Sequence, residues 1–228
     1  MAGKSNSNRK HSGENEMNAK YEFVPGDEKV FATGRTVKRI RALIALGILV
    51  NPGDLGGYIE SESCLSASGN AWVSGNAQIC GDAQICGDAQ ICGDAQIYGD
   101  ARVYGNAQIY GNAQIYGNAE IYGNAEIYGD ARVYGNAQIC GNAWVSGNAE
   151  IYGIGLIVWF TGVGSEHGTL TVYSAKDKTI EVTRGCFKGS IDKFLEASEN
   201  KHDDATHLEY RLLIEVAYNR ITKAQGAA

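Results

Sequence analysis

The sequence predicts a mainly β protein organised around a triangular parallel β-helix with about 18 residues per coil, three six-residue units to each coil. Three observations predict this fold. Fourteen six-residue units follow one another from Gly69 to Tyr152 without insertion or deletion. Each unit opens with Gly followed by Asn or Asp, has Ala third, and has Ile or Val fifth. A fixed short period of this kind is typical of solenoids. An N-terminal β cap and a small C-terminal α+β domain are expected at the two ends.

The unit Gly105–Tyr110, which reads Gly-Asn-Ala-Gln-Ile-Tyr, shows how one side of a coil is formed. Ala107 and Ile109 are two residues apart, so on an extended chain they point to the same side. Gly and Asn tolerate positive φ and supply the corner. Three units close one coil whose inward Ala and Ile form the core, and each buried Ile contributes about 1.5–3 kcal/mol. The alternative, an antiparallel meander, leaves its flat Ala/Ile face without a cover.

Charge and hydropathy narrow the functional classes. The chain has a net charge of −6, and its repeats carry eight acidic and two basic residues, which disfavours binding to duplex nucleic acid. No apolar run approaches the roughly 20 residues of a membrane span. Residues 1–20 are polar, lack the apolar core of a signal peptide and predict a disordered tail. A cytoplasmic location is expected, and an alternative start at Met17 stays open.

Residues 21–58 are expected to form the N-terminal capping segment. Two strands, Tyr21–Val24 and Lys29–Ala32, are predicted on either side of a turn at Pro25–Asp27. A basic cluster follows, which is a candidate contact for nucleic acid or phosphate or, alternatively, a solvated face of the cap: Lys38, Arg39 and Arg41.

The coil is predicted to span residues 59–152. Ile59 and Leu65 are six apart and indicate a degenerate first unit, whereas Val73 follows Leu65 by eight, which indicates a two-residue insertion. Stacking of successive coils brings opposite charges together twice, in the pairs Arg102 with Glu120 and Arg132 with Glu150.

Residues 153–228 are predicted to form the small α+β domain, which closes the open end of the coil. An apolar strand is expected at 156–160, and a hairpin of 169–174 with 179–183. Ser190 can cap a helix that ends near Asn200. A second helix is predicted from about Ala205 to Thr222, with one apolar stripe: Leu208, Leu212, Val216 and Ile221.

Aromatic side chains are the main candidates for ligand or partner contacts. Tyr dominates the sixth position and predicts outward ladders, which serve either cross-strand stacking or a contact surface. The tyrosines singled out are Tyr98, Tyr116 and Tyr134. Trp72 and Trp144 are four coils apart on one face, where they pack against the caps or, alternatively, stack on a ligand.

The six cysteines are interpreted as free thiols in a reducing compartment. Cys80, Cys86 and Cys92 are successive corners of one coil and therefore lie on three different faces. Their spacing follows the repeat and is not a metal-binding motif. No metal and no cofactor are expected.

The run Ile109, Gly111, Asn112 and Ala113 resembles the hexapeptide-repeat pattern of left-handed β-helix proteins, and this resemblance alone implies the left hand of the coil. The stretches 34–60 and 159–187 resemble the ends of hexapeptide-repeat proteins encoded in bacteriophages and prophages. The resemblance covers about residues 21–221 and implies no activity.

Three functions remain open. The first is a noncatalytic phage-type structural or interaction protein built on a homotrimer. The second is a sponge or inhibitor that binds a host defence factor or a small signalling nucleotide. The third is an acyl-CoA-dependent acyltransferase, which is implied by the resemblance of the repeats to hexapeptide-repeat proteins in general and not by the phage-type resemblance of the ends. The repeats contain no His, so no catalytic residue is assigned and an enzyme is not expected. His167 is retained as a low-ranking contact residue near the coil end.

Overall fold

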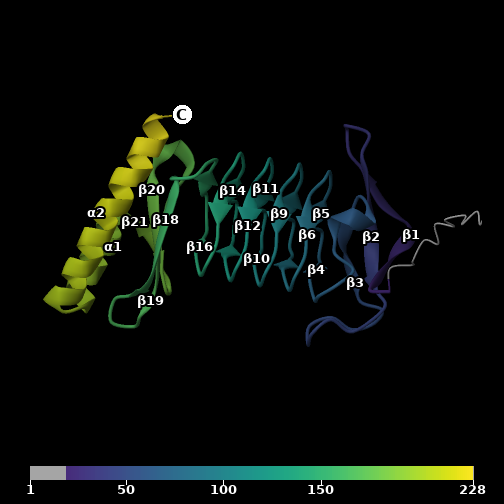
Figure 1. Ribbon diagram of the computed structural model, residues 1–228, viewed down its shortest axis with the longest axis horizontal. Helices are drawn as coiled ribbons and strands as arrows, with labels where there is room; N and C mark the ends of the chain where they lie inside the picture. The colour runs from purple at the N-terminus through teal and green to yellow at the C-terminus, as the bar shows by residue number, and fades with distance from the viewer. Residues whose placement is uncertain (1–18, 228) are drawn as a thin grey trace, which may run out of the picture.

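A computed structural model describes residues 19–227 (Figure 1). Met17 and nearly all of the predicted tail lie outside the described residues. The tail prediction is wrong at its last residue, because Lys20 is buried and its Nζ donates a hydrogen bond to the Ser66 carbonyl over 2.9 Å.

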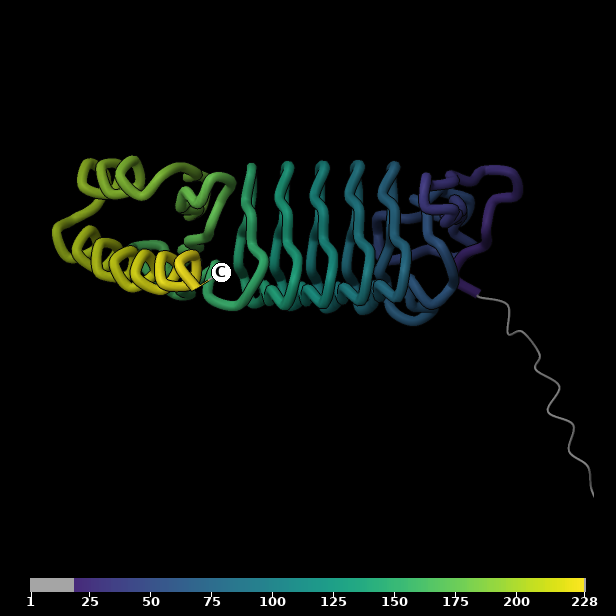
Figure 2. Tube along the Cα trace, turned by 90° about the horizontal axis from the view of Figure 1, so that it is seen from above, coloured from purple at the N-terminus to yellow at the C-terminus, as the bar shows by residue number. Residues whose placement is uncertain are grey.

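The centre of the molecule is a parallel β-solenoid in which each coil adds one short strand to each of three sheets, as the sequence predicts (Figures 1 and 2). Paired residues lie three units apart in the sequence, as in the pair Ile109 and Ile127. The left hand implied by the resemblance stays a prediction. The coil strands are β4 (Trp72–Val73), β5 (Gln78–Ile79), β6 (Gln84–Ile85), β7 (Gln90–Ile91), β8 (Gln96–Ile97), β9 (Arg102–Val103), β10 (Gln108–Ile109), β11 (Gln114–Ile115), β12 (Glu120–Ile121), β13 (Glu126–Ile127), β14 (Arg132–Val133), β15 (Gln138–Ile139), β16 (Trp144–Val145) and β17 (Glu150–Ile151).

The three sheets are named here by their strands. The first face is β5-β8-β11-β14-β17, the second is β4-β7-β10-β13-β16, and the third is β6-β9-β12-β15. Every inward Ala and Ile or Val of the repeats is buried, so the interior is one continuous apolar column. The coils are joined by backbone hydrogen bonds such as Gln108 N to Ala125 O at 2.9 Å. Those bonds satisfy the polar backbone along the buried column.

The N-terminal cap extends the first face with β1 (Tyr21–Val30), β2 (Thr36–Ala42) and β3 (Leu55–Ile59). The predicted turn at Pro25–Asp27 is wrong. The chain continues through it as one strand, because a register shift between Phe23 and Glu28 absorbs Pro25 and Gly26. The reversal comes later, at residues 31–35, where Phe31 N donates to Arg35 O over 2.8 Å.

The two-residue insertion before Val73 is confirmed. Val73 pairs with Ile91 at the regular interval of three units. Before the insertion the interval is longer: Ile59 pairs with Ile79, and Leu65 bridges to Ile85. Each of these partners lies two positions beyond the regular interval. The extra residues lie beyond a short 3₁₀ turn, η1 (Glu62–Cys64).

The C-terminal domain is a four-stranded antiparallel sheet covered by two helices. Its hairpin and the Ser190 cap are confirmed: the Ser190 side chain accepts a hydrogen bond from Lys193 N. The sequence did not predict the last strand. The elements are β18 (Ile157–Val163), β19 (Gly168–Ser174), η2 (Lys176–Lys178), β20 (Ile180–Arg184), β21 (Phe187–Ser190), α1 (Ile191–Lys201) and α2 (Asp204–Gly226).

The predicted apolar stripe of α2 is wrong, because its four residues do not share one side of the helix: Ile221 is buried, whereas the other three are exposed. The residues that α2 buries are Tyr210, Ile214, Ala217, Ile221 and Gln225. Three members of the predicted stripe instead stay 44%, 53% and 48% exposed: Leu208, Leu212 and Val216. Along residues 19–227, no helix has both the length and the apolar character that crossing a membrane needs.

Candidate functional site

The predicted tyrosine ladders are present on all three faces. On the first face Tyr98, Tyr116 and Tyr134 stack with ring centroids 5.0 and 4.8 Å apart and nearly parallel planes. Tyr104 stacks on Tyr122 on the third face at 5.0 Å. Offset stacking at this spacing supports the coil-to-coil contacts. The ladders therefore have a structural role, and their role as contact surfaces stays a prediction.

Several ladder hydroxyls are held by acidic or amide neighbours. Tyr134 Oη donates to Glu150 over 3.1 Å and Tyr128 Oη donates to Glu126 over 2.9 Å. Glu150 lies beside Arg132 in the predicted register, but the two side chains do not form an ion pair. Burial, followed by these hydrogen bonds, raises the pKa of Tyr134 and of Tyr128 to about 12.

We expect Glu150→Gln to lower the pKa of Tyr134 from about 12, because the carboxylate partner is lost. The Tyr134 hydroxyl holds its proton more strongly in the folded chain than in the unfolded chain, where its pKa is about 10. Its contribution to stability is therefore full below about pH 10 and is lost as pH rises towards 12. Phenolate absorbance during a pH titration measures the shift, with Glu199→Gln on α1 as the control. Superimposable curves for both variants and the parent protein contradict the expectation.

The two predicted tryptophans pack against the caps. Trp72 is only 3% exposed and lies beside Gly56, so its ring offers no open face. Trp144 packs edge-to-face on Tyr128 with ring centroids 6.2 Å apart. The C-terminal sheet holds the Trp144 backbone, because Thr171 Oγ1 accepts from its N–H at 3.1 Å and Thr183 Oγ1 donates to its carbonyl at 2.5 Å.

The basic cluster is already paired within the cap. Arg39 Nε donates to Asp27 over 2.7 Å, and its Nη2 donates to Tyr58 Oη over 2.6 Å. Arg41 forms an ion pair with Glu22 at 3.1 Å. Lys38 lies over the Phe23 ring at 5.8 Å. These contacts support the interpretation as a capping face rather than a phosphate site.

His167 lies in the turn between β18 and β19 with a φ of 48°. Its ring is exposed, and no hydrogen bond from it is found within residues 19–227. Nearby, Arg184 donates through Nε to Tyr210 Oη over 3.0 Å and through Nη2 to the Val163 carbonyl over 3.2 Å. Arg184 and Tyr210 line a pocket of about 310 Å³ together with His202, but His167 does not line it. No pattern in the sequence indicated this pocket.

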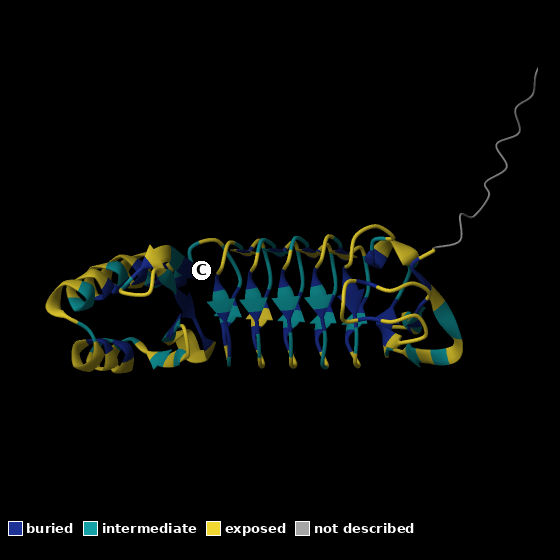
Figure 3. Cartoon of the chain, turned by 90° about the horizontal axis from the view of Figure 1, so that it is seen from below, coloured by how far each residue is buried: buried dark blue, intermediate teal, exposed yellow. Residues whose placement is uncertain are grey.

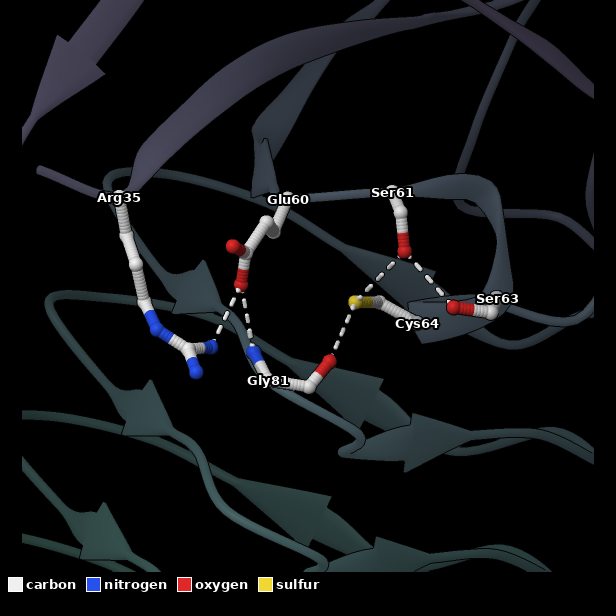
Figure 4. A network of polar contacts seen from close by, with 6 residues as sticks. All are labelled: Arg35, Glu60, Ser61, Ser63, Cys64 and Gly81. Atoms are coloured by element: carbon white, nitrogen blue, oxygen red, sulfur yellow. Dashed lines mark hydrogen bonds and ion pairs between the residues drawn. The ribbon is translucent and has the colours of Figure 1, made fainter.

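A polar network fastens the tip of the N-terminal cap to the coil (Figure 4). Glu60 Oε2 accepts hydrogen bonds from Arg35 Nη1 at 3.0 Å and from the Gly81 N–H at 2.7 Å. The buried Cys64 thiol donates to the Gly81 carbonyl at 3.7 Å and lies 3.6 Å from Ser61 Oγ. The hairpin tip at 31–35 is thereby held over the first face.

Beneath that tip lies a cleft of about 550 Å³, lined by Phe31, Ala32, Thr33, Arg35, Gln78, Cys80, Gln96, Tyr98 and Gly99. Of the predicted site residues, only Tyr98 lies in it. Burial, and then the negative charge of Glu60, raise the pKa of the Cys80 thiol, so the thiol stays protonated at neutral pH. Sequence periodicity could not reveal the cleft, because its roof comes from the cap and not from a repeat.

No cluster of three or more His, Cys, Asp or Glu residues suited to a metal ion occurs in the described part of the chain. The six cysteines are all free.

Two segments of the coil, residues 95–111 and 137–153, match the model of the YdcK beta solenoid repeat. These two segments are similar to that repeat, and the stacked coils to which they belong form a β-solenoid. No curated protein matches the chain significantly.

Proposed function

We propose that the chain is a noncatalytic structural or interaction protein that works as a homotrimer with parallel coil axes. The observation that carries this proposal is an exposed apolar stripe on α2, which consists of Leu208, Leu212 and Val216 and does not include the buried Ile221. A bacteriophage-type origin and a cytoplasmic location belong to the same proposal. The first rests on the resemblance of the chain ends, and the six free thiols support the second.

The stripe has the geometry of a helix contact. Leu208, Leu212 and Val216 are spaced at i, i+4 and i+8, so they lie on one side of the helix. Helix α2 is an outer layer at the C-terminal end, and much of its outward surface is exposed (Figure 3). Neighbouring large apolar residues on a surface mark interaction sites.

The occupant we propose is a second and a third copy of the same helix. Arg211 and Glu215 are exposed next to the stripe and carry opposite charges. In a symmetric contact the arginine of one copy can meet the glutamate of the next, so the helix is complementary to itself. The proposal requires one face of each coil to point to the same threefold axis as this stripe.

We expect Leu212→Glu to convert a trimer into a monomer, because each interface would bury a carboxylate without a partner. Sedimentation velocity measures the mass, and far-UV circular dichroism checks the fold. Tyr218→Glu is the matched control, since Tyr218 is also about half exposed on α2 but lies off the stripe. A monomeric parent protein at micromolar concentration, or a trimeric Leu212→Glu variant, contradicts the proposal.

The acyltransferase and the sponge for a host factor stay predictions. The described histidines, His167, His202 and His207, belong to the C-terminal domain, and no coil strand contains a histidine.

A further inference from the structure

We propose that the cleft under the cap hairpin binds a neutral, planar nitrogen heterocycle of nucleobase size, which extends the tyrosine ladder of the first face by one ring. This inference goes beyond self-association, and neither proposal depends on the other. It rests on a gap in the ladder, on a roof over the gap, and on free amide groups beside it.

The gap is created by a cysteine at a tyrosine position. Along the first face the sixth residues of the stacked units are Cys80, Tyr98, Tyr116, Tyr134 and Tyr152. Tyr98 stacks on Tyr116 with an interplanar angle of 0°. Its other ring face points towards the coil of Cys80, and no described residue stacks there. A thiol is much smaller than a phenol, so a ring-sized space remains at the next step of the ladder.

The cap hairpin covers this space and makes it a cleft. Phe31 and Arg35 line it from the hairpin, while Cys80 and Tyr98 line it from the coil. The hairpin is fixed in place because Arg35 is paired with Glu60, which also binds the Gly81 N–H. Aromatic walls with a few fixed polar groups, in a volume of about 550 Å³, are typical of small-molecule sites.

The polar groups of the cleft suit the edge of a nitrogen heterocycle. Gln78 and Gln96 are neighbours across β5 and β8. Neither side-chain amide has a hydrogen-bond partner among residues 19–227, nor does the Tyr98 hydroxyl. A glutamine amide both donates and accepts, which matches the adjacent donor and acceptor of a base such as adenine. Stacking on an aromatic side chain is tolerant of the kind of base.

The charges of the cleft favour a neutral ligand. Arg35 is the cation in the lining, and Glu60 neutralises it at 3.0 Å. The corner residues Asp82 and Asp100 add negative charge near Gly81 and Gly99. A phosphate group would gain little from the paired arginine, and the negative charge of the neighbouring corners disfavours it. A free base or nucleoside is therefore expected to bind at least as well as its triphosphate.

The second face has a similar gap in its tyrosine ladder, but this gap is less suited to a ligand than the one on the first face. There Cys92 precedes Tyr110, and a pocket of about 350 Å³ forms beside the cap. Its polar groups are occupied, because Gln90 Nε2 donates to the Asn70 carbonyl at 3.1 Å and Tyr110 Oη donates to Gln108 at 2.7 Å. A ligand would have to break those bonds before it could form its own.

The experiment titrates the full-length protein with adenosine, guanosine, cytidine and adenosine triphosphate by calorimetry and saturation-transfer NMR. We expect at least one nucleoside to bind, with the strongest transfer to its base protons and with no gain from the triphosphate. Cys80→Tyr should abolish binding, since the new ring fills the gap, and it should raise the melting temperature by completing the ladder. Gln96→Leu should keep the fold and weaken binding about fivefold, the effect of one neutral hydrogen bond.

The matched control is Cys86→Tyr, which makes the same substitution in the same coil on the third face, away from the cleft. It should leave binding unchanged. The proposal is overturned if no nucleoside binds at millimolar concentration, or if folded Cys80→Tyr binds as well as the parent protein. It is equally overturned if Cys86→Tyr and Cys80→Tyr lose binding together, or if Gln96→Leu binds like the parent. The mass of the assembly, measured separately, tests the trimer.

Discussion

Replacing Gly111 with alanine is expected to lower the free energy of unfolding by about 3 kcal/mol, or the melting temperature by roughly 6–12 °C. Two costs add at this corner. Gly111 has a φ of +76°, a conformation that costs an L-residue roughly 1–2 kcal/mol. A Cβ would also lie 3.0 Å from both the backbone N and the carbonyl O of Gly129 in the next coil. That carbonyl accepts the hydrogen bond from Asn112 N at 2.9 Å, so the neighbouring backbone cannot move without weakening it.

Gly26→Ala is the control that separates the two costs. Gly26 has a nearly identical φ of +78°, and a Cβ there meets nothing within 4 Å. It should therefore lose only the conformational part, about 1–2 kcal/mol. Urea unfolding of both variants, followed by far-UV circular dichroism, gives the difference. If the two substitutions cost the same, the close approach of the coils contributes nothing to the need for glycine.

The coil could be predicted from the sequence because each of its interactions repeats. The interval of three units that places Glu126 beside Gln108 also sets every other strand pair of the coil. A correct interpretation of one unit therefore predicts the pairing of all the regular units. Even the break in this regularity was readable, since the eight-position step from Leu65 to Val73 could only be an insertion.

The two ends could not be predicted to the same depth, because their contacts do not repeat. The β1 strand passes through Pro25 because its partner β2 accommodates a bulge, which the local residues do not reveal. On α2 the exposed side carries Leu208, Leu212 and Val216, although local hydropathy favours such residues on the packed side of a helix. The side of α2 that packs against the sheet carries Tyr210. Its hydroxyl accepts a hydrogen bond from Arg184, which is 26 residues away in the sequence. Local hydropathy could not anticipate that partner.

The candidate site was missed for a related reason. Tyr98 could be singled out as a ladder residue, but the gap beside it depends on which residue lies one coil earlier, and the roof depends on the hairpin. The contact that fixes the hairpin joins Arg35 to Glu60, 25 residues apart, and follows no period. Reading the sixth positions by face, rather than as one list, would have revealed that Cys80 precedes Tyr98.

Deleting whole units should separate the integrity of the coil from the geometry of the assembly. Removal of residues 105–122 takes away three units, which is one full coil. The chain then keeps all inward Ala and Ile residues inward, and the C-terminal domain moves about 4.8 Å closer to the cap without rotating. Removal of residues 105–110 takes away one unit, which also preserves the inward pattern but rotates the C-terminal domain by about a third of a turn.

Both deletions are expected to fold, because each coil contacts only its neighbours and the loss of stability scales with the number of units removed. Their assembly should differ. In a trimer with parallel axes, α2 and one coil face point to the same axis, so the three-unit deletion keeps that alignment and the one-unit deletion breaks it. Sedimentation velocity should therefore give a trimer for the first and smaller species for the second. Equal assembly of the two would show that α2 associates without the coil, which contradicts parallel packing. If only the three-unit deletion unfolds, the premise that each coil is stabilised by its nearest neighbours alone is contradicted, because the remaining coils keep their strands in register.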